Sequence, residues 1–435
     1  MPLSSIFKIL IRQFKTFYVI FEKFITSKTI TMRQFFFIIL ISVICISLSA
    51  QDVAQWRGPN RDGTYNETGL LKKWPDTGPK LLWHFDQLGD GFTSSAVTSS
   101  GVYTTGMTDG NGFVFALDLK GKLLWKKEYG KEWAESHNGV RSTPLIIYEK
   151  LYLESSYGKL LCMNCSNGTT VWTVDLVRDY GARNIQWGMT ENLLSDGNVL
   201  YCTPGGSDAS MVALDINTGK QIWKSKANGE KSAYCSPLMI KLQNKKIIVT
   251  IMQNSICGFD ASTGNQLWKS EFKMDPDVHP NTPVYIDGYL FCTSGYGLGS
   301  VMLKLAGDGN NVSEVWKNQS CDPKMGGVVV LNGRIYGTGD KNRKFFCLDW
   351  KTGKELFSTR DLAPANIIAA DGLLYVYSET GKVNLVEPKT DTFNVISSFS
   401  VPFGADPHWA HLVIKDKKLY VRHGTSLMVY DIAGK

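Results

Sequence analysis

The apolar residues of this chain recur in short alternating runs, separated by turn-forming residues, over most of its 435 positions. In one example, an apolar run over 211–214 is followed by Asp215, by the turn Asn217-Thr218-Gly219, and by a second run over 221–224. Apolar and β-branched runs bounded by such residues are typical of strands, and glycine supplies the positive φ that the turn requires. The pattern therefore predicts two strands joined by a turn, with Trp223 as the large apolar anchor of the second strand.

The same unit recurs at intervals of roughly 40 to 50 residues. Each unit ends in a large apolar anchor, and these anchors are Trp83, Trp125, Trp172, Trp223, Trp268, Trp316, Phe357 and Ile396. A repeat of this length with four strands per unit is typical of a β-propeller.

The repeats divide the chain into eight blades. Seven are complete, at 93–127, 142–174, 192–225, 236–272, 282–317, 326–359 and 366–399. The eighth has three strands and ends at 427–432, and the unpaired strand Leu81–Phe85 can supply its fourth. We therefore predict an all-β, eight-bladed β-propeller over residues 79–435, closed by pairing of its N- and C-terminal strands so that no long edge stays open.

Residues 1–78 carry separate signals. Arg33, the apolar run 35–48 and the small residues ending at Ala50 have the layout of a signal peptide over 32–50, and the run is too short to span a bilayer, which needs about 20 residues. Because Met32 lies where such a peptide begins, residues 1–31 are interpreted as a mis-assigned upstream extension. An uncleaved anchor, or a lipoprotein modified at Cys45, is the alternative. We expect an exported protein, periplasmic or associated with the cell envelope, with no stable transmembrane segment after cleavage.

Residues 51–78 form the next segment. It opens with Trp56-Arg-Gly-Pro-Asn-Arg-Asp-Gly63, whose Pro and Gly residues argue against regular structure. We expect this segment to wrap the outside of the propeller and to bury Trp56 there.

Charge and cysteine placement exclude several classes of function. Most of the formal net charge of +7 comes from residues 1–50, and no Lys/Arg stripe is visible, so no nucleic-acid partner is expected. The cysteines of the repeats occupy matching strand positions, which indicates small buried hydrophobes rather than disulfides: Cys162, Cys257 and Cys347 on third strands, Cys202 and Cys292 on second strands. Cys162 and Cys165 have CxxC spacing but no second pair, so a metal or redox site is not predicted there.

The connections between strands differ on the two faces of the ring. Tight turns such as Asp196-Gly197 join first and second strands, and Asp…Thr-Gly turns join third and fourth strands. Because strands alternate in direction, both kinds of turn lie on one face, the short-turn face. The opposite, long-loop face carries the longer and chemically varied connections, and loops on a rigid scaffold commonly carry function.

Polar and aromatic residues gather in the long-loop connections just before the innermost strands, so we expect them to converge on the ring axis. Aromatic rings with Asn, Arg and Glu suit a sugar, and imidazole with carboxylate suits Zn, Mn or Fe. The candidate ligand-binding residues are His137, Asn138, Arg141, Trp187, Glu191, Tyr234, His279, Asn281 and Trp409. The candidate metal ligands are His137, His279, His408 and His411. Alternatively, the tryptophans fill gaps between blades and the histidines bond to loop backbone.

The motif Ala-x-Asp-x-x-Thr-Gly-x-x-x-Trp at 213–223 resembles the repeat of the PQQ-like propeller superfamily, which includes quinoprotein alcohol dehydrogenases and a lipoprotein of outer-membrane protein assembly. The opening at 56–63 is similar to exported bacterial members. The resemblance covers nearly all of residues 56–432. It implies the fold but no single activity, because this fold hosts many.

The dehydrogenases of that superfamily hold their quinone between a tryptophan and a disulfide of adjacent cysteines, beside a calcium held by Glu, Asn and Asp. This sequence has no two adjacent cysteines, no stretch that matches the calcium set and no CxxCH haem motif. PQQ is therefore not expected as a cofactor.

Three readings of function remain. The preferred one is an exported propeller that binds a glycan or an exported or envelope protein on its long-loop face, without a cofactor. The second is a metal-dependent, lyase-like carbohydrate-active enzyme with histidines at the axis, which requires at least three ligands to meet at one point. The third is a PQQ-dependent oxidoreductase.

Overall fold

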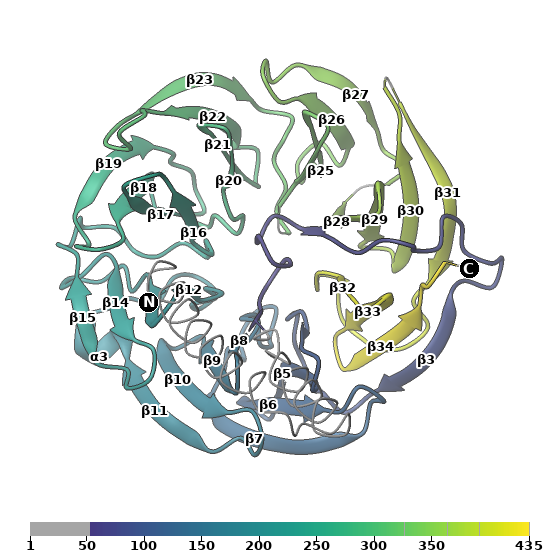
Figure 1. Ribbon diagram of the computed structural model, residues 1–435, viewed down its shortest axis with the longest axis horizontal. Helices are drawn as coiled ribbons and strands as arrows, with labels where there is room; N and C mark the ends of the chain where they lie inside the picture. Colours follow the sequence, from purple (N-terminus) through teal and green to yellow (C-terminus); the bar gives the residue numbers. More distant parts are fainter. Residues whose placement is uncertain (1–52, 326, 363, 391, 435) are drawn as a thin grey trace, which may run out of the picture. The chain divides into compact units, whose positions relative to one another are not determined.

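The computed structural model describes residues 53–325, 327–362, 364–390 and 392–434. The predicted signal peptide and upstream extension lie outside these residues. The described residues form eight antiparallel sheets arranged in a closed ring, which confirms the predicted eight-bladed β-propeller (Figure 1).

Each sheet is one blade, and in the first seven blades the four blade strands run in chain order from the axis to the rim. The first blade contains β4 (Ala96–Val97), β5 (Val102–Thr108), β6 (Asn111–Leu117) and β7 (Leu123–Lys131), and the second contains β8 (Leu145–Ile147), β9 (Lys150–Glu154), β10 (Lys159–Asn164) and β11 (Thr170–Asp175). The third blade contains β12 (Leu194–Asp196), β13 (Val199–Cys202), β14 (Val212–Asp215) and β15 (Gln221–Lys224), and the fourth contains β16 (Leu238–Lys241), β17 (Lys246–Ile251), β18 (Ser255–Asp260) and β19 (Gln266–Glu271). The next three blades contain β20 (Val284–Ile286), β21 (Tyr289–Ser294), β22 (Gly299–Leu305) and β23 (Val312–Asn318); β24 (Val329–Leu331), β25 (Arg334–Thr338), β26 (Phe345–Asp349) and β27 (Glu355–Thr359); β28 (Ala365–Ala370), β29 (Leu373–Ser378), β30 (Lys382–Pro388) and β31 (Phe393–Ser400).

The eighth blade closes the ring as predicted. It combines β32 (Val413–Lys415), β33 (Lys418–His423) and β34 (Ser426–Asp431) with the N-terminal β3 (Lys80–Phe85) as its outer strand. β3 pairs antiparallel with β34, with Lys80 opposite Asp431 and Phe85 opposite Leu427. The two ends of the described chain therefore meet in one sheet.

The hydrophobic core lies between neighbouring blades. Buried side chains of one sheet, such as Tyr201 and Ala213, pack against those of the next, such as Ile248 and Phe259. The described cysteines are buried free thiols, and five of them lie on strands: Cys162, Cys202, Cys257, Cys292 and Cys347. A single short helix, α3 (Leu176–Tyr180), is described between the second and third blades, and no helix in the described residues meets the length and apolar character of a membrane span.

Five of the six anchor tryptophans also join their blade to the following one through a hydrogen bond, whereas the buried indole N–H of Trp268 has no partner among the described residues. In these five, the indole N–H donates to the carbonyl of the residue directly after the Asp or Asn that opens the next blade's outer turn. These bonds run from Trp83 to Leu119 (3.0 Å), Trp125 to Cys165 (2.8 Å), Trp172 to Ile216 (3.1 Å), Trp223 to Ala261 (3.1 Å) and Trp316 to Trp350 (3.3 Å). The repeat motif thus specifies contacts between blades as well as a turn within one.

The prediction that residues 51–78 wrap the outside is wrong for residues 53–65, which we call the plug. Within it, β1 (Val53–Ala54) pairs with β8, and β2 (Thr64–Tyr65) pairs with β28. Because β8 and β28 are the innermost strands of the second and seventh blades, the plug crosses the ring axis (Figure 1). Residues 66–79 then run outward over the short-turn face, where Leu70 N donates to Asp371 at 2.9 Å, and reach β3 at the rim.

Two buried arginines hold the plug in place. Arg57 donates to the carbonyls of Val328 (2.6 Å) and Ile367 (3.5 Å), and Arg61 to those of Asn192 (2.6 Å) and Leu193 (2.9 Å). These carbonyls belong to the third, sixth and seventh blades. The physical reason for the location is that the axis of an eight-bladed ring is left open by its inner strands, and the plug supplies the side chains and hydrogen bonds that close it.

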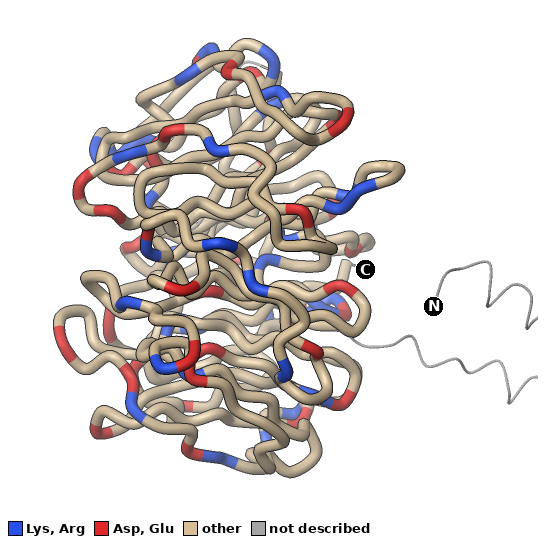
Figure 2. The backbone as a smooth tube through the Cα atoms, turned by 90° about the vertical axis from the view of Figure 1, so that its left-hand side faces the viewer, with Lys and Arg blue, Asp and Glu red and all other residues tan. Residues whose placement is uncertain are grey.

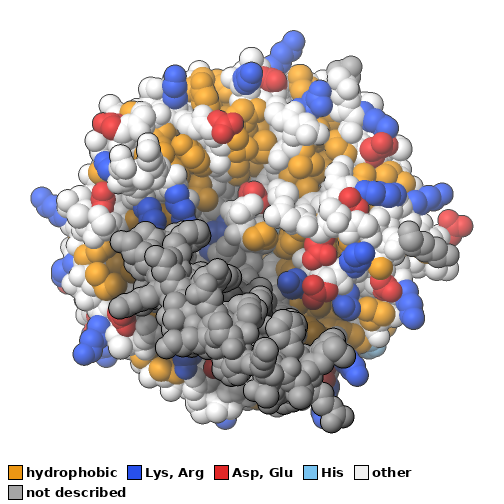
Figure 3. Space-filling model, viewed as in Figure 1, with side chains coloured by type: hydrophobic (Ala, Val, Ile, Leu, Met, Phe, Trp, Pro, Cys, Tyr) orange, Lys and Arg blue, Asp and Glu red, His pale blue; other side chains and the backbone are white. Residues whose placement is uncertain are grey.

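Basic and acidic side chains are mixed over the described surface. Figure 2 shows both signs along the side of the ring, and Figure 3 shows them interspersed around the rim of the face seen in Figure 1, outside the residues drawn in grey. This mixing agrees with the sequence, in which no basic stripe is visible.

Candidate functional site

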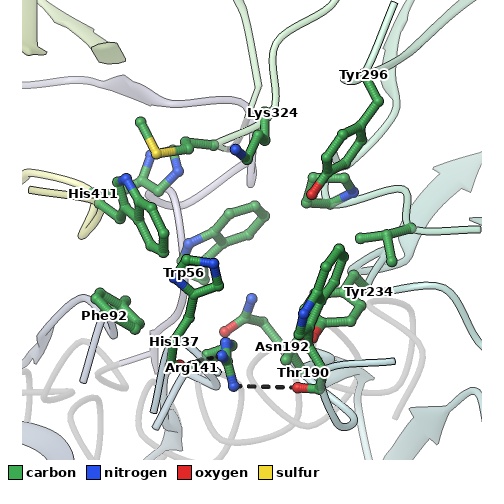
Figure 4. A pocket seen from close by; sticks show the side chains of 15 residues that line it. Trp56, Phe92, His137, Arg141, Thr190, Asn192, Tyr234, Tyr296, Lys324 and His411 are labelled. Atoms are coloured by element: carbon green, nitrogen blue, oxygen red, sulfur yellow. Dashed lines mark hydrogen bonds between the residues drawn. The ribbon is translucent and has the colours of Figure 1, made fainter. Parts of the chain in front are cut away.

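A cup of about 380 Å³ lies at the ring axis on the long-loop face (Figure 4). Its lining comes from the connections before the innermost strands of most blades, from one loop between second and third strands, and from the plug. The lining residues are Trp56, Phe92, His137, Arg141, Trp187, Thr190, Asn192, Tyr234, Val278, Pro280, Tyr296, Lys324, Met325, Trp409 and His411. The cup thus lies on the face where the long connections predict a binding site.

Aromatic rings form the walls and the floor of the cup. Trp187 and Tyr296 lie nearly parallel, with ring centroids 6.3 Å apart and an interplanar angle of 15°. On the other side, the centroid of the Trp409 ring lies 5.0 Å from that of Phe92 and 5.2 Å from that of His137. Such surfaces bind apolar ring faces.

The floor is formed by Trp56 of the plug and His411, whose rings meet edge to face at 5.2 Å. Arg57 donates to His411 Nδ1 at 3.2 Å. Burial, together with the neighbouring Arg57 charge, holds the pKa of His411 well below its usual value. The floor histidine is therefore neutral, with Nδ1 as an acceptor.

Three lining residues have left-handed backbone conformations that side chains rarely adopt: His137 (φ 53°), Tyr234 (φ 71°) and Tyr296 (φ 60°). Each such residue costs about 1–3 kcal/mol, and strain of this kind concentrates at functional sites. The Tyr234 hydroxyl is buried and has no hydrogen-bond partner among the described residues. The loops of the cup are thus held in conformations that place aromatic side chains and a hydroxyl at fixed positions.

Arg141 is a desolvated cation at the wall. Its guanidinium donates to the carbonyls of Trp187 (3.2 Å), Gly139 (3.4 Å) and His137. Burial lowers its pKa, and an arginine at such a site still carries its charge. Arg141 therefore fixes two loops of the cup and contributes a positive charge to it.

Several predicted site residues do not reach the cup. Glu191 is buried below the loops, where it accepts from Thr203 N at 3.0 Å, and burial raises its pKa to about 8. Asn281 donates to the carbonyls of Thr293 and Pro323 at 3.1 and 2.7 Å. Asn138 is exposed and donates to Asp90 at 2.7 Å. These three side chains form hydrogen bonds that hold the loops in place, and they do not line the cavity.

The four predicted metal ligands do not form a metal site, and this prediction is wrong. His279 is fully buried against Gln253 O at 3.3 Å, and His408 bonds to Tyr377 and stacks on His423 with centroids 3.6 Å apart. Only His137 and His411 line the cup. Among the described residues, no three His, Cys, Asp or Glu side chains come close enough together to hold a metal ion. His279 and His408 bond to Gln253 and Tyr377, which belong to the neighbouring fourth and seventh blades, and this explains why the two histidines do not reach the cup.

Sequence reasoning found His137, Arg141, Trp187, Tyr234, Trp409 and His411 but missed other lining residues. Phe92 directly precedes the first blade and could have been found by the rule that found the rest. Tyr296, flanked by Gly295 and Gly297, lies between a second and a third strand, a class of loop that faces the same way. The position of Trp56 at the axis could not be predicted, because the sequence around Trp56 does not show which residues it packs against.

Comparison with known proteins agrees with this architecture. The family model described as outer membrane protein assembly factor BamB matches residues 75–178 and 110–310, together more than half of the chain. BamB of Kangiella koreensis is 29% identical over 149 residues, which are 32% of this chain and 35% of that protein. The quinoprotein alcohol dehydrogenase PedH of Pseudomonas putida is 26% identical over 244 residues, which are 55% of this chain and 39% of that protein.

The chain thus spans well under half the length of these two relatives. The crystal structure of BamB from Moraxella catarrhalis covers 80% of this chain and 98% of its own, with a TM-score of 0.55 at 15% identity, a likeness of fold. The chain belongs to the PQQ-like β-propeller superfamily, in the family described as outer membrane protein assembly factor BamB.

Proposed function

We propose that this chain is an exported binding protein that takes a glycan ring into the axial cup. The observation that carries the proposal is the pair of aromatic walls, with Trp187 and Tyr296 on one side and Trp409 on the other. A sugar ring offers apolar faces to such walls and hydroxyls to polar groups between them. Thr190 and Asn192, which line the cup, supply those polar groups.

An export role fits the sequence and the family match. The match to an outer membrane assembly factor supports a location in the cell envelope, and the signal-peptide pattern at 32–50 is what such a location requires. We infer that the mature protein is periplasmic or attached to the envelope.

A test of glycan binding uses an oligosaccharide array followed by calorimetry on the chain with residues 51–435. Trp187→Ala should weaken binding by about 1–3 kcal/mol, the range measured for stacking on an aromatic side chain. Tyr157→Ala is the matched control, because Tyr157 is 42% exposed on the same face and does not line the cup. Equal affinities for parent and Trp187→Ala, or no binder on the array, would contradict the proposal.

A protein partner is the second candidate, and the BamB family match favours it. An extended segment of an envelope protein would insert an aromatic side chain into the same cup. Affinity purification from the native envelope should then retain a partner with the parent and with Tyr157→Ala but lose it with Trp187→Ala. If the parent and both variants retain the partner, the partner binds outside the cup.

A further inference from the structure

Among the described residues that line the cup, the charged side chains are Arg141 and Lys324, which are both basic. The carboxylates of Asp340 and Glu379 lie outside this lining, where Asp340 pairs with Lys324 at 3.8 Å and Glu379 accepts from Trp409 at 3.3 Å. The two cations lie on opposite sides of the cup, with Trp56 between them (Figure 4). A ligand that enters between the aromatic walls therefore meets positive charge at both ends.

Arg141 has no ion-pair partner among the described residues. Its three bonded acceptors are neutral carbonyl oxygens. A cation held away from water and unpaired is unfavourable, and an anionic ligand group relieves that cost. Arg422 is also buried among hydroxyls and carbonyls, but it does not line the cup and serves only to join blades. Arg141 combines such burial with access to the cavity.

Lys324 faces the cup from the opposite wall. Its ammonium lies 5.4 Å from the centre of the Tyr296 ring and 6.0 Å from that of Trp409. Asp340 is the nearest acid, at 3.8 Å, which is longer than a hydrogen bond, and its other oxygen accepts from Tyr296 N at 3.2 Å. Lys324 is therefore held over the walls with donors left for a ligand.

We infer, on the basis of the proposed glycan binding, that the ligand is an acidic glycan whose uronic acid carboxylates meet Arg141 and Lys324. The sugar ring lies between Trp187, Tyr296 and Trp409. Its hydroxyls meet the polar side chains of Thr190 and Asn192, and successive acidic residues bring one carboxylate toward each cation. Neutral glycans lack the group that compensates Arg141 and bind more weakly.

The test compares uronic acid oligosaccharides of several linkages with the same oligosaccharides after reduction of their carboxyl groups, so that ring and linkage stay constant. Calorimetry at low and high NaCl should show that each acidic binder is at least tenfold tighter than its reduced form, with a preference that shrinks as salt rises. Lys324→Gln should reduce this preference, and Arg141→Lys should retain more of it than Arg141→Gln. Lys241→Gln, on the innermost strand of the fourth blade and outside the cup, is the control for net charge and should leave the preference unchanged.

The possible results separate the two proposals. Tighter binding of the reduced oligosaccharides, or equal loss of preference with Lys241→Gln, would overturn the acidic ligand while glycan binding stands. Absence of binding to either form would overturn both. Thermal unfolding of each variant checks that Arg141→Gln still folds, and Lys324→Gln decides the question if it does not.

Discussion

At the residue scale, the glycine of each outer turn has two roles. Gly264 has a φ of 76°, as the turn requires, and a Cβ added to it would lie 2.4 Å from the Trp223 ring of the preceding blade. The same relation holds between Gly219 and Trp172. The sequence pattern predicts the first role, because turn chemistry is local. The second involves residues about 40 positions apart, so only the closed ring reveals it.

Gly264→Ala should therefore cost more than a turn substitution alone. Gly288 has a φ of 87° with no atom within 4 Å of an added Cβ, so Gly288→Ala carries only the conformational cost of about 1–2 kcal/mol. Gly264→Ala should lower the free energy of unfolding by about 1–3 kcal/mol more, as overpacking does. Denaturant unfolding of both variants measures the difference, and equal losses would show that the tryptophan contact contributes nothing.

A buried histidine gives the molecule an acid sensitivity. Burial lowers the pKa of His279 from 6.5 to about 4, so the folded protein resists its protonation while the unfolded chain accepts it. The contribution of neutral His279 to the free energy of unfolding is fully present above pH 6.5. It falls by about 1.4 kcal/mol per pH unit as the pH decreases from 6.5 toward 4.

The difference in free energy of unfolding between the parent and His279→Gln should accordingly be constant above pH 6.5. Below pH 6.5 the parent should lose stability relative to the variant. Urea unfolding at a series of pH values measures this difference, in which groups common to both proteins cancel. A difference that stays flat from pH 7 to pH 4 would show that His279 is not held neutral.

At the element scale, the N-terminal segment has two separate structural duties. The plug fills the axis through Arg57 and Arg61, and β3 completes the eighth blade against β34. The strand was predictable because its Leu-Leu-Trp pattern matches the outer strands of the repeats. The plug was not, because its hydrogen bonds go to carbonyls of blades far away in the sequence.

Truncations should separate these duties. A chain that begins at residue 66 lacks the plug and keeps β3, so it should still form a ring, with lower stability and no closed floor in the cup. A chain that begins at residue 87 also lacks β3 and exposes the edge of β34, which should cause association between molecules. Light scattering and circular dichroism distinguish the two, and a monomeric, fully folded chain from residue 87 would contradict the role assigned to β3.

At the scale of the whole molecule, repeat spacing and turn type predicted the number of blades, the closure of the ring and the face on which the cup lies. They predicted the residues that line the cup only in part. Residues such as Trp187 and Trp409 were found because position before an inner strand fixes their approach to the axis. Glu191, His279 and His408 occupy similar positions but bond to Thr203, Gln253 and Tyr377 outside their own loops, and the sequence pattern does not show these distant partners.

The same architecture bears on cofactor use. No Asp or Glu is among the described residues that line the cup, and the described cysteines are buried free thiols. Titration with PQQ and calcium should produce no saturable change in quinone absorbance and no dye-linked alcohol oxidation. A saturable, calcium-dependent site of micromolar affinity would contradict this expectation and favour the oxidoreductase reading.

The plug also limits how a polymer could be handled. With residues 53–65 across the axis, the plug separates the cup on the long-loop face from a second cavity that the plug itself lines together with the innermost strands of the third, fourth and fifth blades. A long glycan cannot be threaded through the ring and must instead present a chain end or a side branch, and it must leave by the way it entered. Binding should then depend on the number of ends in a polymer sample rather than on its mass, so that cutting a polysaccharide into shorter pieces multiplies the sites it offers.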